Sequence, residues 1–358
     1  MGYLKTIALG LCLIFATPAM AETVLLVPQK VGGGTSVWAS IVAKELEKYL
    51  NEPVRLEHIP SARDIGGFNE WHNNLSNNDD YIMVSHGGNG VSFLQEEVDY
   101  NYADYDSVGL MNLNIIVAKR KDMKEIRFAA GSGMVPEAFA IAMLECGNGH
   151  TTAGYTMCFQ NKVKWVKGMS GGERRLAFKR GELTATRENP AAYKKHVEGD
   201  KNAETWFHHG ILDMDGEHYD DPNHRGYQFE DLYERKWGKR PSGDFYDAYK
   251  LVKSFRDGMQ KALWVRKGNP HRQRYVDALN QVATNPESVA AIRAKVGDYD
   301  WYTGDWGNQH RDNLMTLITP EALNSLVQFN TEALGLKSIY KEELIKCVGD
   351  CRVAKKVD

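Results

Sequence analysis

The first hundred residues alternate between short apolar runs and amphipathic stretches. Residues 22–27, 54–59 and 81–85 are rich in apolar and β-branched side chains, which is typical of strands. The stretch "TSVWASIVAKELEKYL" has apolar positions at the i, i+3 and i+4 spacing of a helix, and Asn-Glu-Pro at 51–53 ends it. A second helix is expected at 68–75. This order of elements predicts an α/β fold with a parallel sheet and crossover helices.

The turn after the first predicted strand is rich in glycine. Gly32, Gly33 and Gly34 lead into Thr35 and Ser36, which begin the first helix. A helix N-terminus offers unpaired amides and a partial positive charge, so residues 33–36 are expected to bind a carboxylate or phosphate. The spacing is not that of a dinucleotide-binding fingerprint, and no P-loop lysine follows. A glycine turn that only reverses the chain remains the alternative.

The first residues have the pattern of an export signal. Lys5 precedes an apolar run at 7–16, and Ala-Met-Ala at 19–21 fits a cleavage site, so 1–21 is expected to be a signal peptide. Its removal leaves 337 of the 358 residues and changes the formal charge from −3 to −4. That length favours two domains, and the charge gives no basis for binding nucleic acid or anionic membranes. The protein is expected in the periplasm.

Four cysteines remain after the signal. Two local disulfides, Cys146–Cys158 and Cys347–Cys351, are expected in an oxidising compartment, although four cysteines allow three pairings and free thiols are the alternative. Neither pair has further ligand residues at metal-binding spacing, so no metal site is expected at the cysteines.

The order of several motifs resembles a known family. "GGGTS" at 32–36 is similar to the GGGTD loop of the periplasmic substrate-binding proteins of tripartite tricarboxylate transporters, also called Bug or TctC-like proteins. "IPSARDIGGFNEW" at 59–71 keeps the position and the Ile-Gly of the family's second loop. "DYIMVSH" at 80–86 resembles its third strand, and "YNYADYDSVGLM" at 100–111 resembles the segment before its domain crossover.

The resemblance continues in the C-terminal half. "AAGSGMVPEAF" at 129–139 is placed like a loop of the family's second domain, and "VKWVKGMSGGERRLAFKRGEL" at 163–183 resembles its V-P-Y-K-G segment. Residues 262–297 are similar to the segment that returns to the first domain. The resemblance depends on the order of these motifs along the chain, and no single motif is decisive.

The resemblance implies two α/β domains with a ligand cleft between them, the type II periplasmic-binding-protein-like fold. Domain 1 is expected at 22–125 and 263–345. Domain 2 is expected at 126–262, with an enlarged insert at about 190–249, and 346–358 forms a tail.

The implied function is capture of a small organic anion, such as a di- or tricarboxylate, and its delivery to the permease subunits of a tripartite tricarboxylate-type transporter. No catalysis, cofactor or bound metal is expected, and the protein is expected to be a monomer. The residues expected to bind the ligand are Gly33, Gly34, Thr35, Ser36, Arg63, His86, Gly87, Asn89, Ser132, Gly133, Lys167, Gly168, Ser170 and Arg187.

Several side chains depart from the family pattern. Ser36 and Ser40 stand where the family often has Asp and Arg. Either a structural i,i+4 pair is lost, or a negative charge has gone from the cleft mouth, which would favour anions without an amino group. Arg63 is either a carboxylate ligand or a solvated loop arginine. Arg174 and Arg175 belong to a run of cations that is expected to be mostly a solvated helix face.

The insert is the largest departure. "FHHGILDMDGEHYDDPNHRGYQF" at 207–229 concentrates acids and histidines, but Gly216 is fourth from Asp213, whereas an EF-hand loop needs glycine at the sixth position. A lid over the cleft or an added docking face is expected, with a metal site as the alternative.

Sugar binding and hydrolysis are the alternative functions. Sugar binding would use exposed aromatic platforms, for which Trp38, Trp71 and Trp165 are candidates among eight tryptophans. A secreted hydrolase would need a nucleophile motif, and neither G-x-S-x-G nor H-E-x-x-H occurs in the sequence. A Ser-His-Asp triad can form from residues that are distant in sequence, so a hydrolase is the second alternative.

Overall fold

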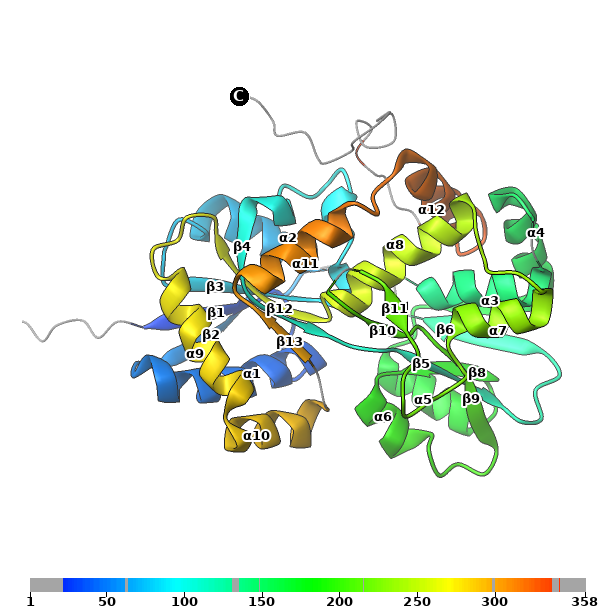
Figure 1. Ribbon diagram of the computed structural model, residues 1–358, viewed down its shortest axis with the longest axis horizontal. Helices are drawn as coiled ribbons and strands as arrows, with labels where there is room; N and C mark the ends of the chain where they lie inside the picture. Colours follow the sequence, from blue (N-terminus) through cyan, green and yellow to red (C-terminus); the bar gives the residue numbers. More distant parts are fainter. Residues whose placement is uncertain are drawn as a thin grey trace, which may run out of the picture.

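The alternating first half contributes four strands to a six-stranded mixed sheet, and the other two come from the second half (Figure 1). In spatial order its strands are β13 (Asp300–Thr303), β4 (Tyr105–Asn112), β12 (Lys261–Arg266), β3 (Tyr81–His86), β1 (Thr23–Val27) and β2 (Val54–His58). β1 is parallel to β2 and β3, as the sequence predicts, whereas β12 is antiparallel to β3 and β4. The computed structural model describes residues 22–61, 64–130, 135–147, 149–214, 216–297, 300–336 and 341.

Helices cover both faces of this sheet. On one face lie α1 (Gly34–Leu50), α9 (Arg272–Thr284) and α10 (Pro286–Val296); on the other lie α2 (Ile65–Glu70), the turn that continues it (Trp71–Leu75) and α11 (Asp305–Met315). β1 is buried along its whole length: Leu25 and Val27 join the core under α1, and Leu26 joins the core on the other face. A strand buried on both faces explains the continuous apolar run in the sequence.

The second domain contains two smaller sheets. β8 (Ala185–Glu188), β5 (Ile116–Arg120) and β9 (Ala203–His208) are antiparallel, and β6 (Ile126–Ala130) pairs in parallel with β7 (Val163–Lys167). The surrounding helices are α3 (Pro136–Cys146), α4 (Thr152–Lys162), α5 (Gly171–Lys179), α6 (Pro190–His196), α7 (Phe229–Trp237), α8 (Asp244–Gly258) and α12 (Pro320–Glu332). Within the described residues, no helix is long and apolar enough to cross a bilayer.

The chain passes between the domains at 113–115, at 259–260 and at 316–319. The first two passages lie side by side, because the amide of Leu113 donates to the carbonyl of Asp257 (3.0 Å) and that of Gln260 donates to the carbonyl of Met111 (3.1 Å). Short paired segments of this kind are suited to act as a hinge.

These passages correct the domain boundaries expected from sequence. β5 pairs with β8 and β9, so the first passage precedes it instead of lying at 125. α12 packs on α4 and α8, although the sequence predicts 263–345 in the first domain. The ring of Phe329 in α12 lies 4.4 Å from that of Phe139 and 5.3 Å from that of Phe159. Covering this aromatic cluster is a long-range requirement that local sequence does not reveal.

The insert is built into the second domain. It contains α6, β9 and α7, together with the small hairpin of β10 (Ile211–Leu212) and β11 (His218–Tyr219). The hairpin also reaches the first domain: the carbonyl of Leu212 accepts from Tyr302 (3.2 Å) and from Asn112, and that of Met214 accepts from Asn313 (2.7 Å).

One of the two expected disulfides is confirmed. Cys146 at the end of α3 is bonded to Cys158 within α4, 12 residues away. Cys347 and Cys351 lie outside the described residues, as do residues 1–21.

We expect the double substitution Cys146→Ala/Cys158→Ala to lower the free energy of unfolding by about 3 kcal/mol, because the bond closes a short loop in the unfolded chain. Chemical denaturation of the variant and the wild type measures this difference. Met157→Ala, at an exposed position of the same helix as Cys158, is the control and should leave stability unchanged. An unchanged unfolding midpoint in the first variant would contradict the expectation.

Candidate functional site

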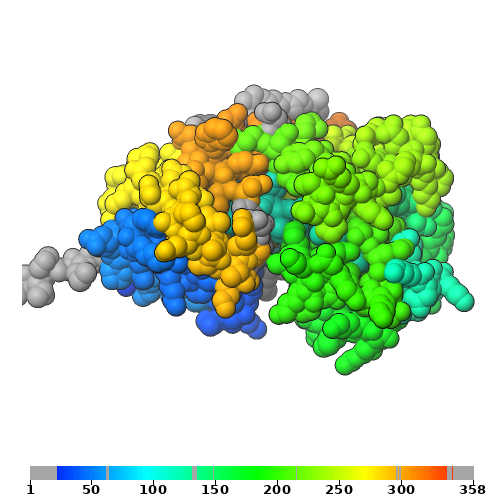
Figure 2. Space-filling model, turned by 60° about the horizontal axis from the view of Figure 1, so that its bottom comes forward, coloured from blue at the N-terminus to red at the C-terminus, as the bar shows by residue number. Residues whose placement is uncertain are grey.

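A cavity of about 550 Å³ opens between the two domains, in the groove visible in Figure 2. The first domain contributes Gly32, Gly34 and Val37, and the passage between domains contributes Leu113 and Gln260. The charged residues that line it are Arg174, Arg175, Arg187, Lys195, Arg256, Lys261, Lys295 and Glu188. Seven cations therefore face one carboxylate.

The predicted glycine turn forms one wall. Gly32 has φ +84°, which glycine adopts without strain, and Gly33 is the N-cap of α1. The first i→i−4 bond of the helix runs from the amide of Val37 to the carbonyl of Gly33, so the amides of Gly34, Thr35 and Ser36 precede the helical bonds. This end of a 17-residue helix is suited to face an anion.

The side chains of Thr35 and Ser36 do not point freely into the cavity. Both are buried; Thr35 Oγ1 accepts from Lys261 Nζ (3.1 Å), and Ser36 Oγ lies 2.9 Å from His58 Nε2. Thr35 therefore positions the ammonium of Lys261. Burial lowers the pKa of Lys261 to about 8, while the negative charge of Asp64 acts in the opposite direction.

Two arginines of α5 form part of the opposite wall. Arg174 is 7% exposed and donates to Thr186 Oγ1 (3.3 Å) and to the carbonyl of Arg187 (3.0 Å), both neutral acceptors. Burial lowers the pKa of Arg174, although an arginine stays charged at neutral pH. Arg175 donates to Glu188 through Nε (3.0 Å) and through a terminal nitrogen (2.7 Å).

A buried carboxylate holds the remaining arginines. Glu137, in the first turn of α3, is completely buried, and its Oε1 lies 3.2 Å from a nitrogen of Arg187 and 2.5 Å from one of Arg256. One carboxylate thus joins β8 and α8 through two cations. Among the described residues, the carboxylates near Arg174, Arg175, Arg187, Arg256 and Lys261 are Glu137, Glu188 and Asp64, which leaves two positive charges.

The structure places the turn at 86–89 behind the wall of the cavity. His86 Nε2 lies 2.7 Å from Asp64, its Nδ1 accepts from the amide of Gly88, and burial lowers its pKa. A Cβ at Gly87 would lie 2.0 Å from the carbonyl oxygen of Arg256, so only glycine allows this turn to pack on the end of α8. Asn89 is buried and its Oδ1 accepts from the amide of His86. These residues position Arg256.

Other predicted ligands are not among the residues that line the cavity. Lys167 Nζ donates to the carbonyl of Gly335 (3.2 Å), and the amide of Gly168 donates to Ala130. Ser170 caps α5 and bonds reciprocally with Glu173. Of the fourteen predicted ligands, Gly34 and Arg187 line the cavity directly, and Arg63, Ser132 and Gly133 lie outside the described residues.

Most of the cations in the cavity are not among the residues predicted to bind the ligand. The sequence places Arg174 and Arg175 on a mostly solvated helix face, but Arg174 is buried and both line the cavity. Arg256 and Lys261 flank the second passage between domains, a position that only the topology reveals. No signal in the sequence points to these cations: Glu137 follows the helix-starting Pro136, but its burial, which requires cationic partners, is seen only in the structure.

The three tryptophans expected as sugar platforms are not open to a ligand. Trp38 and Trp71 are completely buried, which contradicts their use as open platforms. Trp165 packs on the core beside Phe128 and donates to the carbonyl of Leu334.

Solved structures share this architecture. A TctC solute-binding protein from Polaromonas is 15% identical, with a TM-score of 0.51 over 87% of this chain and 100% of that one. MatC from Rhodopseudomonas palustris with bound malate is 13% identical, with a TM-score of 0.51 over 87% and 99%. An R. palustris protein with adipate is 11% identical, with a TM-score of 0.52 over 88% and 99%.

The chain has the two-domain fold of periplasmic solute-binding proteins. The α/β fold class expected from sequence is thereby confirmed, and the sequence resemblance is matched at the level of fold. No protein-family model and no curated protein matches the sequence.

We expect Glu137→Gln to lower the free energy of unfolding by about 3 kcal/mol, because it leaves two buried arginines without a compensating charge. Denaturant unfolding at neutral pH measures the change. Glu125→Gln is the control, since Glu125 is a partly exposed partner of Lys164 and Arg127 on the same domain and its loss should leave stability unchanged. An equal change in the free energy of unfolding in both variants would contradict the expectation that the buried ion pairs stabilise the fold.

We expect anion affinity to fall above pH 8, by at most about tenfold per pH unit, as Lys261 loses its proton. The unfolded chain keeps this proton to about pH 10, so between pH 8 and pH 10 the unligated protein gains stability from this group as pH rises. Calorimetric titration and thermal unfolding across this range measure the two opposite trends. Lys261→Gln should abolish both, whereas Lys267→Gln, outside the cavity, should retain both.

Proposed function

We propose that the protein is a periplasmic solute-binding protein that captures a small organic anion with two or more carboxylates. The cationic cavity between the domains carries this proposal. Its five buried or partly buried cations exceed the three nearby carboxylates Glu137, Glu188 and Asp64 by two charges, and a ligand with two or more carboxylates would compensate this excess.

Both walls offer suitable partners for carboxylate oxygens. Arginines donate paired, charge-assisted hydrogen bonds, and the amides at the start of α1 add neutral donors on the facing domain. Each bond would gain strength once the ligand displaces water from the cleft, because the local dielectric falls. Binding would therefore draw the two half-sites together.

The paired passages at 113–115 and 259–260 support closure around such a ligand, since they are the short segments next to the cavity. Closed and open forms would present different surfaces to a membrane partner. We propose that the closed form delivers the anion to the permease subunits of a tripartite tricarboxylate-type transporter, and that residues 1–21 direct export.

The shared fold is consistent with this function. Malate and adipate, the molecules present in two of the similar structures, are both dicarboxylates. Binding without chemical conversion is the function proposed for this chain.

Titration of the mature protein with di- and tricarboxylates tests the proposal. A ligand at about a thousand times its dissociation constant should add roughly 4 kcal/mol of stability, seen as a rise of several degrees in the unfolding temperature. Sugars of similar size should give no shift. Stabilisation by sugars and by none of the acids would make the proposal wrong, and turnover of a stabilising acid would indicate an enzyme.

A further inference from the structure

A second cavity adjoins the cationic one. Its volume is about 700 Å³, and it shares Leu113, Ala191 and Lys195 with the first cavity. Part of its wall comes from the loop after β11, through Asp221, Asn223 and His224. Another part comes from Asn112 at the end of β4 and from Asn114 in the passage between domains. The enlarged insert therefore extends the ligand cleft instead of only covering it.

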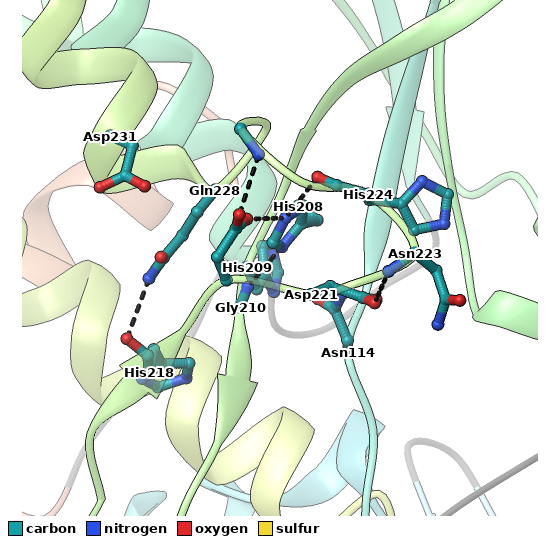
Figure 3. Close-up of polar contacts among 12 residues, drawn as sticks. Asn114, His208, His209, Gly210, His218, Asp221, Asn223, His224, Gln228 and Asp231 are labelled. Carbon is teal, nitrogen blue, oxygen red and sulfur yellow. Dashed lines mark hydrogen bonds and ion pairs between the residues drawn. The ribbon is translucent and has the colours of Figure 1, made fainter.

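The chemistry of this second compartment differs from that of the first. Asp221 is 4% exposed, and its carboxylate accepts from Asn114 Nδ2 (2.8 Å) and from the amide of Asn223 (2.8 Å), both neutral donors (Figure 3). The adjacent Asp220 is instead bonded to His208 Nε2 (3.0 Å). Among the ion pairs of the described residues, none compensates Asp221. A buried carboxylate bonded only to neutral donors favours a cation beside it.

Asn114 provides a second, independent observation. It is 5% exposed, and within the described part of the chain its Oδ1 has no hydrogen-bond partner. The bond from its Nδ2 to the carboxylate of Asp221 fixes the orientation of the amide, because only the NH₂ group can donate. Asn114 therefore leaves an acceptor beside Asp221, and a ligand with several N–H donors can satisfy both.

The other charged groups around this compartment do not supply the missing cation. Lys194, Lys195 and Arg293 are exposed, as are Glu198 and Asp300, so three cations and two carboxylates lie at the solvent boundary. Solvent screens these groups, whereas a group in contact with the buried Asp221 would be screened much less. The buried Asp221 therefore determines that the compartment favours a cation.

The neighbouring histidines also leave Asp221 uncompensated. Burial is the largest cause that lowers the pKa of His208 and of His224, although Asp221 acts to raise both. Both rings are therefore mainly neutral at pH 7. Among the described residues, no three His, Cys, Asp or Glu side chains are grouped to hold a metal ion, so an organic cation fits better than a metal.

We infer that the ligand is an amino-substituted carboxylic acid, with its carboxylates in the cationic compartment and its ammonium group against Asp221 and Asn114. This inference rests on the proposed function and specifies its substrate class. It also revises the interpretation that Ser36, standing where the family often has aspartate, favours ligands without an amino group. The insert supplies a carboxylate at a different place in the cleft.

Matched ligands that differ only in the amino group test the inference. Calorimetric titrations compare glutarate with glutamate and adipate with 2-aminoadipate, on the wild type and on two variants. Asp221→Asn removes the charge but keeps an acceptor for Asn114. Asp220→Asn is the control, because Asp220 is the adjacent carboxylate and does not line the cavity.

The wild type should bind at least one amino acid about tenfold or more tightly than the matching diacid, and Asp221→Asn should remove that preference while retaining affinity for the diacid. Retained diacid binding also shows that the variant is folded. Asp220→Asn should keep the preference. Diacid binding without any preference in the wild type, or an equal loss of both ligands in Asp221→Asn, would overturn the inference alone. Binding of no acid of either kind would overturn the proposed function and this inference with it.

Discussion

The buried carboxylate of Glu137 is the interaction on which the cleft depends. It lies at the start of α3, where the helix dipole favours a negative charge, and it contacts Arg187 of β8 and Arg256 at the end of α8, where the dipole favours a positive one. Without it two guanidinium groups would be buried side by side. With it, three elements that are distant in sequence form one rigid wall.

That wall explains why residues outside the cavity are constrained. Gly87 is required because a side chain there would collide with the backbone of Arg256. The hydrogen bonds of His86 fix the turn at 86–89. On the facing domain, Thr35 orients Lys261. Buried polar groups therefore hold the cations near one another. This arrangement is electrostatically unfavourable until an anion compensates the positive charge.

The insert adds a buried group of the opposite charge to the cleft. Residues 207–224 leave the sheet at β9, form a hairpin that bonds to the first domain through Tyr302 and Asn313, and return to place Asp221 beside Asn114. The segment is thereby attached to both domains. A cleft with a cationic and an acceptor-rich compartment discriminates between ligands by the positions of their charges, and not only by their total charge.

The sequence by itself determined the local structure. Continuous apolar runs identified β1 and β3, the glycine turn and apolar stripe identified α1, and cysteine spacing identified the Cys146–Cys158 bond. These features depend on neighbours in the chain. The position of Gly34 at the cleft also followed, because parallel strands present their carboxyl ends at one edge.

Only the tertiary structure decided which charges meet. Arg174 looks like a solvated arginine in sequence, and nothing local distinguishes Asp221 from Asp220 or links Glu137 to Arg256, 119 residues away. The placement of α12 on the second domain was equally hidden. The physical reason is that burial and charge pairing depend on long-range contacts, whereas periodicity and turn chemistry record only what lies within a few residues.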